Sequence, residues 1–343
     1  MTFALRSFAL AGVFVLAACG GGGGSAGGGS GGVGSGPQSV AITESNAKPV
    51  AANAVDSAQN TSATSGAALP IGVQVDAAAG ATQLQQLAAI VKHAATSAAG
   101  ARLPVGISIS ETLACSQGGT MTISGNVASP NGIGAGDTLS ISASNCAESV
   151  GGQTEVVNGQ LAVTIASGSI TDALPFHVVM NVTVTNLSVQ AGGVTTVANG
   201  DVRLDWTANS LTSETLSASG TAMSTRQTIS GTTRTNTMRN YTQTLTVNGS
   251  TFTGTLSATI ETDSTRLGNA TVKYTITTPT PLVWSASTRL ATAGVVKVVG
   301  ANNSQLVATI AANGTVAIQV DANGDGTFET TVTSTTAELS GLR

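Results

Sequence analysis

Apolar residues alternate with threonine and serine along most of the chain after residue 107. A period of two puts the apolar side chains on one face of an extended strand and the hydroxyl side chains on the other. One buried face and one hydrated face are typical of antiparallel sheets. In the run 178–189 the apolar residues change from even-numbered to odd-numbered positions between Val184 and Leu187. This break in the alternation predicts a β-bulge. The clearest alternating runs are 121–123, 139–143, 161–165, 178–184, 202–206, 256–260, 272–276, 306–310 and 316–320.

The links between these runs are short, and they contain Asn-Gly pairs at Asn158, Asn199, Asn248 and Asn313. Asn-Gly is a strong β-hairpin signal because both turn residues adopt positive φ. We therefore expect a mainly β fold, an antiparallel meander of about 10–14 strands. A sheet of this size must protect its edges by packing or closure, so a sandwich, a barrel and a curved sheet remain alternatives.

The low charge of the chain narrows its possible partners. Among 343 residues, 13 Lys and Arg stand against 17 Asp and Glu, which gives a net charge of −4. Electrostatic binding to nucleic acid needs a basic surface, so we expect no nucleic-acid partner. No apolar run reaches the length of about 18 residues that suggests a transmembrane helix.

One segment, residues 82–99, has the periodicity of a helix. Thr82 and Gln85 fit a capping box, and Gly100 is suited to the C-terminal stop. The expected apolar face consists of Leu84, Leu87, Ala88, Val91 and Ala95. This face needs a partner, and the downstream sheet is the one available.

The segments that flank this helix, 69–75 and 103–109, share the pattern L-P-[IV]-G-[VI]-x-[VI]. Two matching strands around a helix would form a right-handed βαβ unit. Chance similarity in a sequence of low complexity is the alternative. We place a strand–helix–strand lead at 67–110 and the β meander at 111–343, both within one β-rich domain, 67–343.

The N-terminus predicts export. Arg6 precedes an apolar stretch from Phe8 to Ala18, too short to span a bilayer, so residues 1–18 are expected to be a signal peptide. The sequence Leu16-Ala17-Ala18-Cys19 resembles the lipobox of bacterial lipoproteins. The resemblance implies cleavage before Cys19 and acylation of that residue, for example with palmitate, so that the membrane partner is reached through a lipid anchor. An ordinary secretory peptide is the alternative.

The residue after the cysteine is Gly20, where an aspartate would favour retention in the inner membrane of Gram-negative bacteria. By this resemblance the protein is expected at the outer membrane, on either face. Residues 20–36 are almost only glycine and serine, and a stretch rich in Ser, Ala, Asn and Thr continues to Gly66. We expect 19–66 to be the lipidated cysteine and a disordered, flexible tether.

The other two cysteines, Cys115 and Cys146, are expected to pair in an oxidising envelope. They lie just before and just after the first two alternating runs, so a disulfide would staple that hairpin. A redox or metal-binding pair is the alternative, but no histidine lies nearby and the spacing is not C-x-x-C.

The most specific polar cluster is the segment 321–329, with Asp321, Asn323, Asp325 and Glu329. It resembles the first half of a calcium-binding D-x-[DN]-x-[DN]-G loop, which implies Ca²⁺ as a possible cofactor. Val332 stands where an EF-hand has its bidentate glutamate. The alternative is a glycine-rich hairpin turn that joins 316–320 to 328–332.

A stretch from 216 to 260 has no acidic residue and contains Arg226, Arg234 and Arg239, with Tyr241 nearby. A basic, hydroxyl-rich face of this kind would bind an anionic glycan or a lipopolysaccharide phosphate. Solvent-facing strand arginines that protect the sheet are the alternative.

Titratable groups suited to acid–base catalysis are few, with only His93 and His177 as histidines. We therefore predict a non-enzymatic envelope module that binds a glycan or an envelope protein, or has a structural role. A periplasmic lipid carrier or chaperone with an apolar cavity is the first alternative, and a hydrolase is the second.

Overall fold

The computed structural model describes residues 36–59, 85, 87–88, 91–92, 107–128, 133–150, 153–171, 173–229, 231–264, 267, 271–285, 287–288 and 290–342. Its helices are η1 (Glu44–Asn46), α1 (Ala47–Gln59), η3 (Ala301–Asn303) and α3 (Thr336–Gly341). Its first strands are β1 (Gln38–Ser39), β2 (Ile107–Ala114), β3 (Thr120–Val127), β4 (Ile133–Gly134), β5 (Thr138–Val150), β6 (Gln153–Ile170), β7 (Phe176–Ala191) and β8 (Val194–Ser210). The others are β9 (Ser213–Ile229), β10 (Thr232–Asn248), β11 (Thr251–Thr262), β12 (Val272–Ser285), β13 (Ala291–Val299), β14 (Gln305–Ile310), β15 (Thr315–Asp321) and β16 (Thr330–Thr335).

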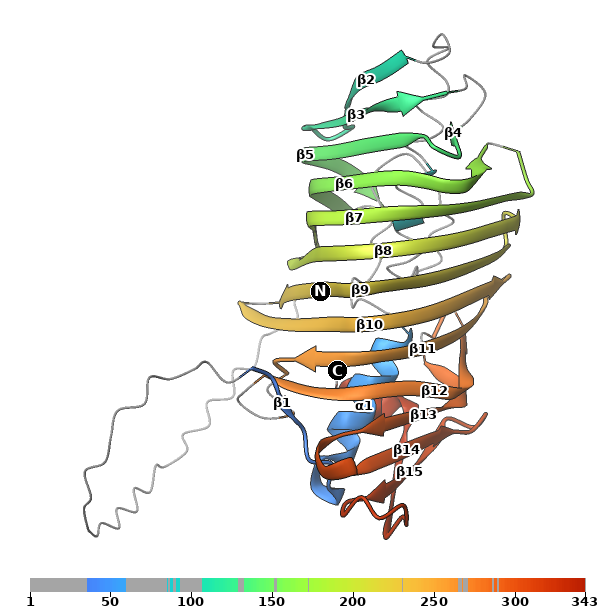
Figure 1. The fold of residues 1–343 in the computed structure, drawn as a ribbon. Coiled ribbons are helices and arrows are strands. Elements are labelled where there is room, and N and C mark those ends of the chain that lie inside the picture. Colours follow the sequence, from blue (N-terminus) through green and yellow to red (C-terminus); the bar gives the residue numbers. More distant parts are fainter. Residues whose placement is uncertain are drawn as a thin grey trace, which may run out of the picture. The chain divides into compact units, whose positions relative to one another are not determined.

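All sixteen strands belong to one sheet whose order follows the chain from β16 back to β2 (Figure 1). Neighbours along this path pair antiparallel; short β4 pairs with β6, and β1 adds to β12 in parallel. Among the described residues the end strands β2 and β16 do not pair with each other, so the sheet is open. The predicted antiparallel meander is confirmed, and of the three forms left open it is the curved sheet.

The predicted helix at 82–99 is supported wherever that segment is described. Residues 85, 87–88 and 91–92 are helical, and Leu87, Ala88 and Val91 of the expected apolar face are buried. Gln85 Nε2 donates to Glu214 Oε1 at 2.8 Å, and Lys92 Nζ lies 5.2 Å from the Phe176 ring centroid. These contacts place the helical residues over the N-terminal ends of β7 and β9. The segment 69–75 lies outside the described residues.

The expectation of a flexible tether up to residue 66 is wrong for residues 38–59. There β1 joins β12, and α1 packs against β11–β16 and α3 (Figure 1). The helix buries small residues, which let its backbone lie close to the sheet: Ala47, Val50, Ala51, Ala52, Ala54, Val55 and Ala58. Lys48 Nζ is 2.6 Å from Glu338 Oε1, and Tyr274 donates a hydrogen bond to Asn53 Oδ1.

Two of the four Asn-Gly pairs form hairpins and two do not. Asn248-Gly249 joins β10 to β11 and Asn313-Gly314 joins β14 to β15, as predicted. Asn158-Gly159 and Asn199-Gly200 instead lie inside the long strands β6 and β8. Gly159 and Gly200 adopt φ of +116° and +147°, values that favour glycine and that accompany the bulges at these positions.

These internal pairs belong to a line of β-bulges across β5–β10. Asn158 Oδ1 accepts from the Asn145 N–H at 2.7 Å, and Asn199 Oδ1 accepts from the Asn186 N–H at 2.7 Å. The hairpins β5–β6 and β7–β8 thus repeat one arrangement. The register shift predicted between Val184 and Leu187 is present, and another separates Arg239 from Thr242.

The bulge line divides the helix-facing side of β6–β10 into two halves. The apolar half lies toward the β6–β7 and β8–β9 turns, and its residues are almost fully buried: Leu161, Val163, Val182, Leu204, Leu216 and Leu245. The polar half lies toward the β7–β8 and β9–β10 turns, at the left of Figure 1. Its residues are Glu155, Val157, Leu187, Val189, Thr196, Ala198, Met223, Gln227, Arg234, Asn236 and Met238.

Candidate functional sites

The expected lipidation site, Cys19, lies outside the described residues, as does Gly20. Within the part of the chain that the structure describes, no helix is long and apolar enough to cross a membrane.

The predicted disulfide between Cys115 and Cys146 is present. The two Cα atoms lie 5.3 Å apart, and the bridge spans a sequence separation of 31 residues. Cys115 follows β2, and Cys146 belongs to β5 beside the bulge at Asn145. The bridge therefore staples the β3–β5 hairpin, as the sequence predicted, and a 31-residue loop corresponds to roughly 3–4 kcal/mol of chain entropy.

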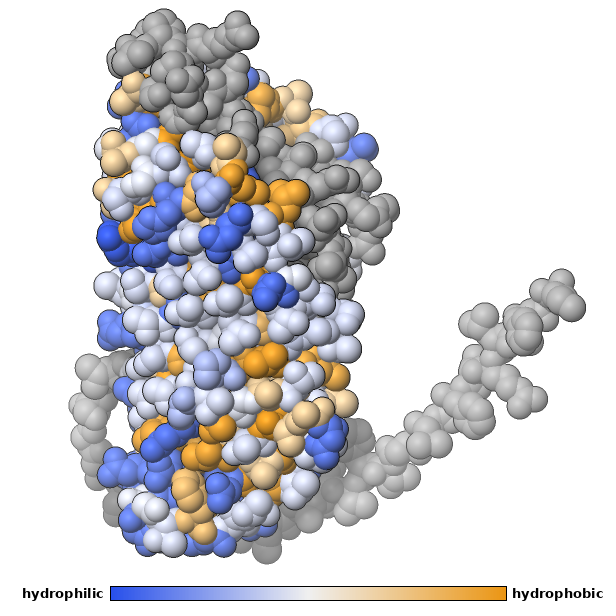
Figure 2. Space-filling model, turned by 90° about the vertical axis from the view of Figure 1, so that its right-hand side faces the viewer, coloured by the Kyte–Doolittle hydropathy of each residue, from blue (hydrophilic) through white to orange (hydrophobic). Residues whose placement is uncertain are grey.

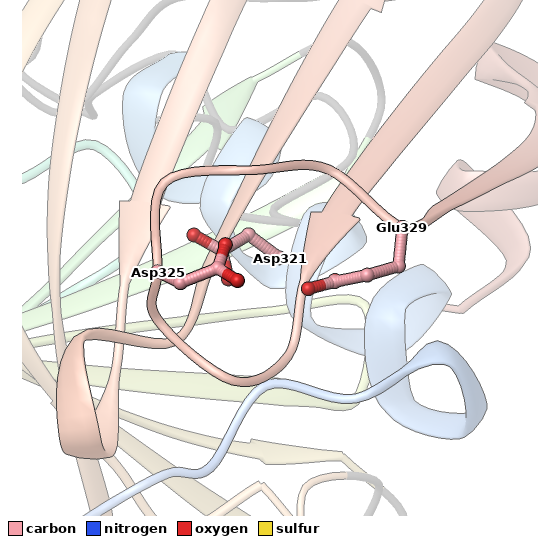
Figure 3. Close-up of side chains that lie close together, drawn as sticks. All are labelled: Asp321, Asp325 and Glu329. Atoms are coloured by element: carbon pink, nitrogen blue, oxygen red, sulfur yellow. The ribbon is translucent and has the colours of Figure 1, made fainter.

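The loop 321–329 brings three carboxylates together (Figure 3). One ligand atom from each of Asp321, Asp325 and Glu329 lies within 4.8 Å of the others, and the three side chains point toward the middle of the loop. Asp321 ends β15 and is fully buried, whereas Asp325 and Glu329 are exposed. This spacing is compatible with oxygen ligands around one hard cation.

The same carboxylates also hold the loop together. Asp321 accepts from Gln305 Nε2 at 2.8 Å, from the Gly324 N–H at 2.6 Å and from the Gly326 N–H at 2.9 Å. These bonds, led by that of Gln305, lower the pKa of Asp321, so this carboxylate stays ionised. Both expectations from the sequence, a calcium loop and a structural turn, use this ionised carboxylate.

Asn323 takes part in the turn: its Oδ1 accepts from the Asp325 N–H at 2.8 Å, and its Nδ2 donates to Asp325 Oδ2 at 3.1 Å. Glu329 Oε2 accepts from the Ala322 N–H at 3.2 Å. Every polar residue singled out in this segment therefore has a hydrogen-bonding role in the loop, and calcium binding stays a prediction.

The three arginines expected to form one basic face are divided between the two faces of the sheet. Arg226 is opposite Thr235, while its neighbour Gln227 is opposite Arg234. Because adjacent strand residues point to opposite faces, Arg226 and Arg234 do as well. Arg239 shares the outer face with Arg226, and its Nε lies 2.7 Å from Glu261 Oε2.

Tyr241, the fourth residue of that set, belongs to the core. It is 2% exposed, and its hydroxyl donates to the Asp201 carbonyl at 2.7 Å. Burial, and then the charge of Asp201, raise the pKa of Tyr241. The structure therefore does not bring the four residues together: two arginines remain on the outer face, with Glu261 beside one of them.

His177 lies on the outer face of β7 with its side chain half exposed, and its Nε2 is 2.9 Å from Asp205 Oδ1. Across the face of the molecule in Figure 2, hydrophobic atoms form scattered groups among hydrophilic ones. Two large apolar residues are strongly exposed among the described residues, Leu211 at 92% and Ile229 at 43%, both at hairpin ends.

The polar half contains buried polar residues, of which Glu155, Thr196 and Asn236 were not predicted from the sequence, whereas Arg234 was. Glu155 is 1% exposed, its Oε2 has no hydrogen-bond partner among the residues that the structure describes, and burial raises its pKa to about 8. Thr196 Oγ1, Arg234 Nε and Nη2, and Asn236 Oδ1 are buried without a partner in the structure as described. The available signal was a charged or amide residue at a strand position that alternation places on the same inward face as the residues two places away.

Scans against family models, curated proteins and solved structures found no match to this chain.

Proposed function

We propose that this chain is a lipid-anchored protein of the bacterial outer membrane whose β-sheet body serves as a non-enzymatic binding or structural module. The observation that carries the proposal is Leu16-Ala17-Ala18-Cys19, which follows a short apolar segment and precedes a glycine-rich stretch. Two or three acyl chains on one residue hold a protein stably on a membrane.

The test is membrane fractionation of the full chain and of Cys19→Ala. We expect the unaltered chain in the membrane fraction, with an N-terminal peptide that begins at Cys19 and carries acyl chains by mass spectrometry. We expect the variant to lose stable membrane attachment. Equal attachment of the variant, or an unacylated N-terminus, would contradict the proposal.

A second variant addresses the membrane. Gly20→Asp places an acidic residue directly after the cysteine, and by the lipoprotein resemblance it is expected to move the protein to the inner membrane. Gly20→Ser is the matched control and is expected to remain with the outer membrane. Protease treatment of intact cells then distinguishes the outer from the periplasmic face.

A lipid carrier is the second candidate function, and one observation favours it. The sheet is open and curved, and Leu187, Val189 and Met238 of its polar half are only partly buried, although they pack against the core. Partly covered apolar surface beside polar groups suits an amphiphile. Lipids that copurify with the full chain, identified by mass spectrometry, would support this function, and their absence would count against it.

A further inference from the structure

The guanidinium of Arg234 is an unusual group on the helix-facing side of the sheet. Its Nε and Nη2 are shielded from solvent and lack a hydrogen-bond partner among the described residues, and no described carboxylate forms an ion pair with it. These two nitrogens form one edge of the guanidinium, whose parallel N–H groups match the two oxygens of a carboxylate. Leaving such donors unpaired is costly, so the edge calls for an acceptor.

Cross-strand pairing shows what surrounds this edge. Arg234 is opposite Gln227, which is opposite Thr196, which is opposite Val189. Opposite residues share a face, so the arginine begins a row that becomes apolar toward β7. Thr196, two strands away, is 8% exposed, and its hydroxyl is also without a described partner.

Along β10 the same face continues through Asn236 to Met238, which is opposite Met223. Four residues of strand cover about 13 Å. Both methionines are partly buried against the core, and methionine adapts its shape to apolar ligands. The site thus has the charged guanidinium edge of Arg234 at one end and flexible apolar side chains at the other. These are the features of a site for an elongated amphiphile.

The charges near the guanidinium edge of Arg234 favour a ligand whose head group carries a single negative charge. Burial raises the pKa of Tyr274; among the charges that act on its phenol, Arg234 opposes this rise and Asp56 adds to it. One arginine compensates one carboxylate, whereas a phosphate monoester would leave buried negative charge uncompensated.

We propose that the polar half of the sheet binds a fatty acid, with its carboxylate on the Nε–Nη2 edge of Arg234 and its chain along Asn236, Met238 and Met223. This site rests on the second function proposed above, the lipid carrier, and names its ligand class. The two nitrogens are shielded, so the head group reaches them by displacing neighbouring side-chain atoms.

The test is calorimetric titration of the full Cys19→Ala chain, which is designed to need no detergent, with monomeric dodecanoate. Arg234→Gln is expected to weaken binding about tenfold or more, the loss of charge-assisted hydrogen bonds. Arg226→Gln, on the opposite face of the same hairpin, is expected to bind normally. Arg234→Lys keeps the positive charge but lacks the two parallel N–H groups, and it is also expected to bind dodecanoate weakly. This second variant keeps the test valid if the glutamine variant fails to fold.

Further ligands in the same titration distinguish a failure of the fatty-acid site from a failure of the lipid-carrier function. Acetate tests the head group alone, dodecyltrimethylammonium the chain alone, and dodecyl phosphate a doubly charged head group; each is expected to bind more weakly than dodecanoate. Copurified lipids together with dodecanoate binding that Arg234 variants leave unchanged would overturn this site but keep the carrier. Neither copurified lipids nor dodecanoate binding would overturn both, and tighter binding of dodecyl phosphate would overturn the carboxylate assignment.

Discussion

The two halves of the helix-facing side of β6–β10 are built from the same strands but are packed differently. In β9, Leu216 and Ala218 of the apolar half are buried, while Met223 and Gln227 of the polar half are partly exposed. The described helical residues Gln85 and Lys92 contact Glu214 and Phe176, at the apolar end of β9 and β7. One half is thus a finished core, and the other keeps donors and acceptors that have no partner in the described part of the chain.

The bulge line is the boundary between these halves. At each bulge one extra residue shifts the alternation, so that Tyr241 and Leu245 face inward on one side of Asn240 while Arg234 and Met238 do so on the other. A single strand can therefore present two kinds of inner face. Proteins that separate stability from binding in this way can keep polar groups unsatisfied until a ligand arrives.

The largest effect is expected for core truncation in the apolar half. Leu216→Ala removes a fully buried side chain from β9 and should lower the free energy of unfolding by about 2–5 kcal/mol. Met223→Ala, in the polar half of the same strand, should cost about 1 kcal/mol because the side chain is already partly exposed. Chemical denaturation measures both, and equal losses would refute the difference between the halves.

The bulge line itself is tested at Gly200. A Cβ there would lie 2.2 Å from the Ala222 carbonyl oxygen, and φ is +147°. Gly200→Ala should therefore cost on the order of 3 kcal/mol, from backbone strain together with overpacking. Gly193→Ala is the control, since its positive φ is combined with open space. Similar denaturation midpoints for the two variants would argue against a tight bulge.

Glu155, in the polar half, should make the free energy of unfolding depend on pH. Burial raises its pKa from the usual 4.5 to about 8, so the folded state holds the proton more tightly than the unfolded chain. The free energy of unfolding should then fall as pH rises from about 4.5 to about 8, on the order of 3 kcal/mol in total.

Glu155→Gln should remove this fall, making the variant more stable than the unaltered protein at pH 9 and comparable at pH 4. Thermal unfolding across that pH range measures the effect. Parallel pH profiles for the two proteins would show that Glu155 is not a buried acid.

The smallest effect concerns the 321–329 loop, away from both halves. If it binds calcium with the millimolar to submillimolar affinity of extracellular modules, a few millimolar Ca²⁺ should stabilise the protein by about 1 kcal/mol. Asp325→Asn should abolish the gain. An unchanged melting temperature on adding Ca²⁺ after chelation would leave the structural turn as the explanation.

Periodicity predicted the fold well because a half-buried strand has a local signature. The alternation in 178–184 and 316–320 located β7 and β15, and the parity slip at Val184 located a bulge. Asn-Gly at 158 and 199 was misleading because glycine accommodates the positive φ of a bulge as readily as that of a turn. Whether the chain reverses there depends on strands that a local pattern does not include.

The candidate sites were predicted less well. The segment 47–59 has the small, polar composition of a tether, yet its alanines and valines fit closely on the sheet, and only Pro49 in the first turn indicated a helix. The arginine set was selected by sequence proximity, while strand alternation separates Arg226 from Arg234. That Nε and Nη2 of Arg234 find no hydrogen-bond partner among the described residues depends on long-range packing, which no local motif encodes.

Hydrogen–deuterium exchange along β9 most directly tests the claim that one half is a finished core and the other a binding surface. We expect slow exchange for amides 213–218, faster exchange for 224–229, and added protection of 224–229 alone when dodecanoate is present. Uniform protection along the strand that dodecanoate leaves unchanged would contradict the account.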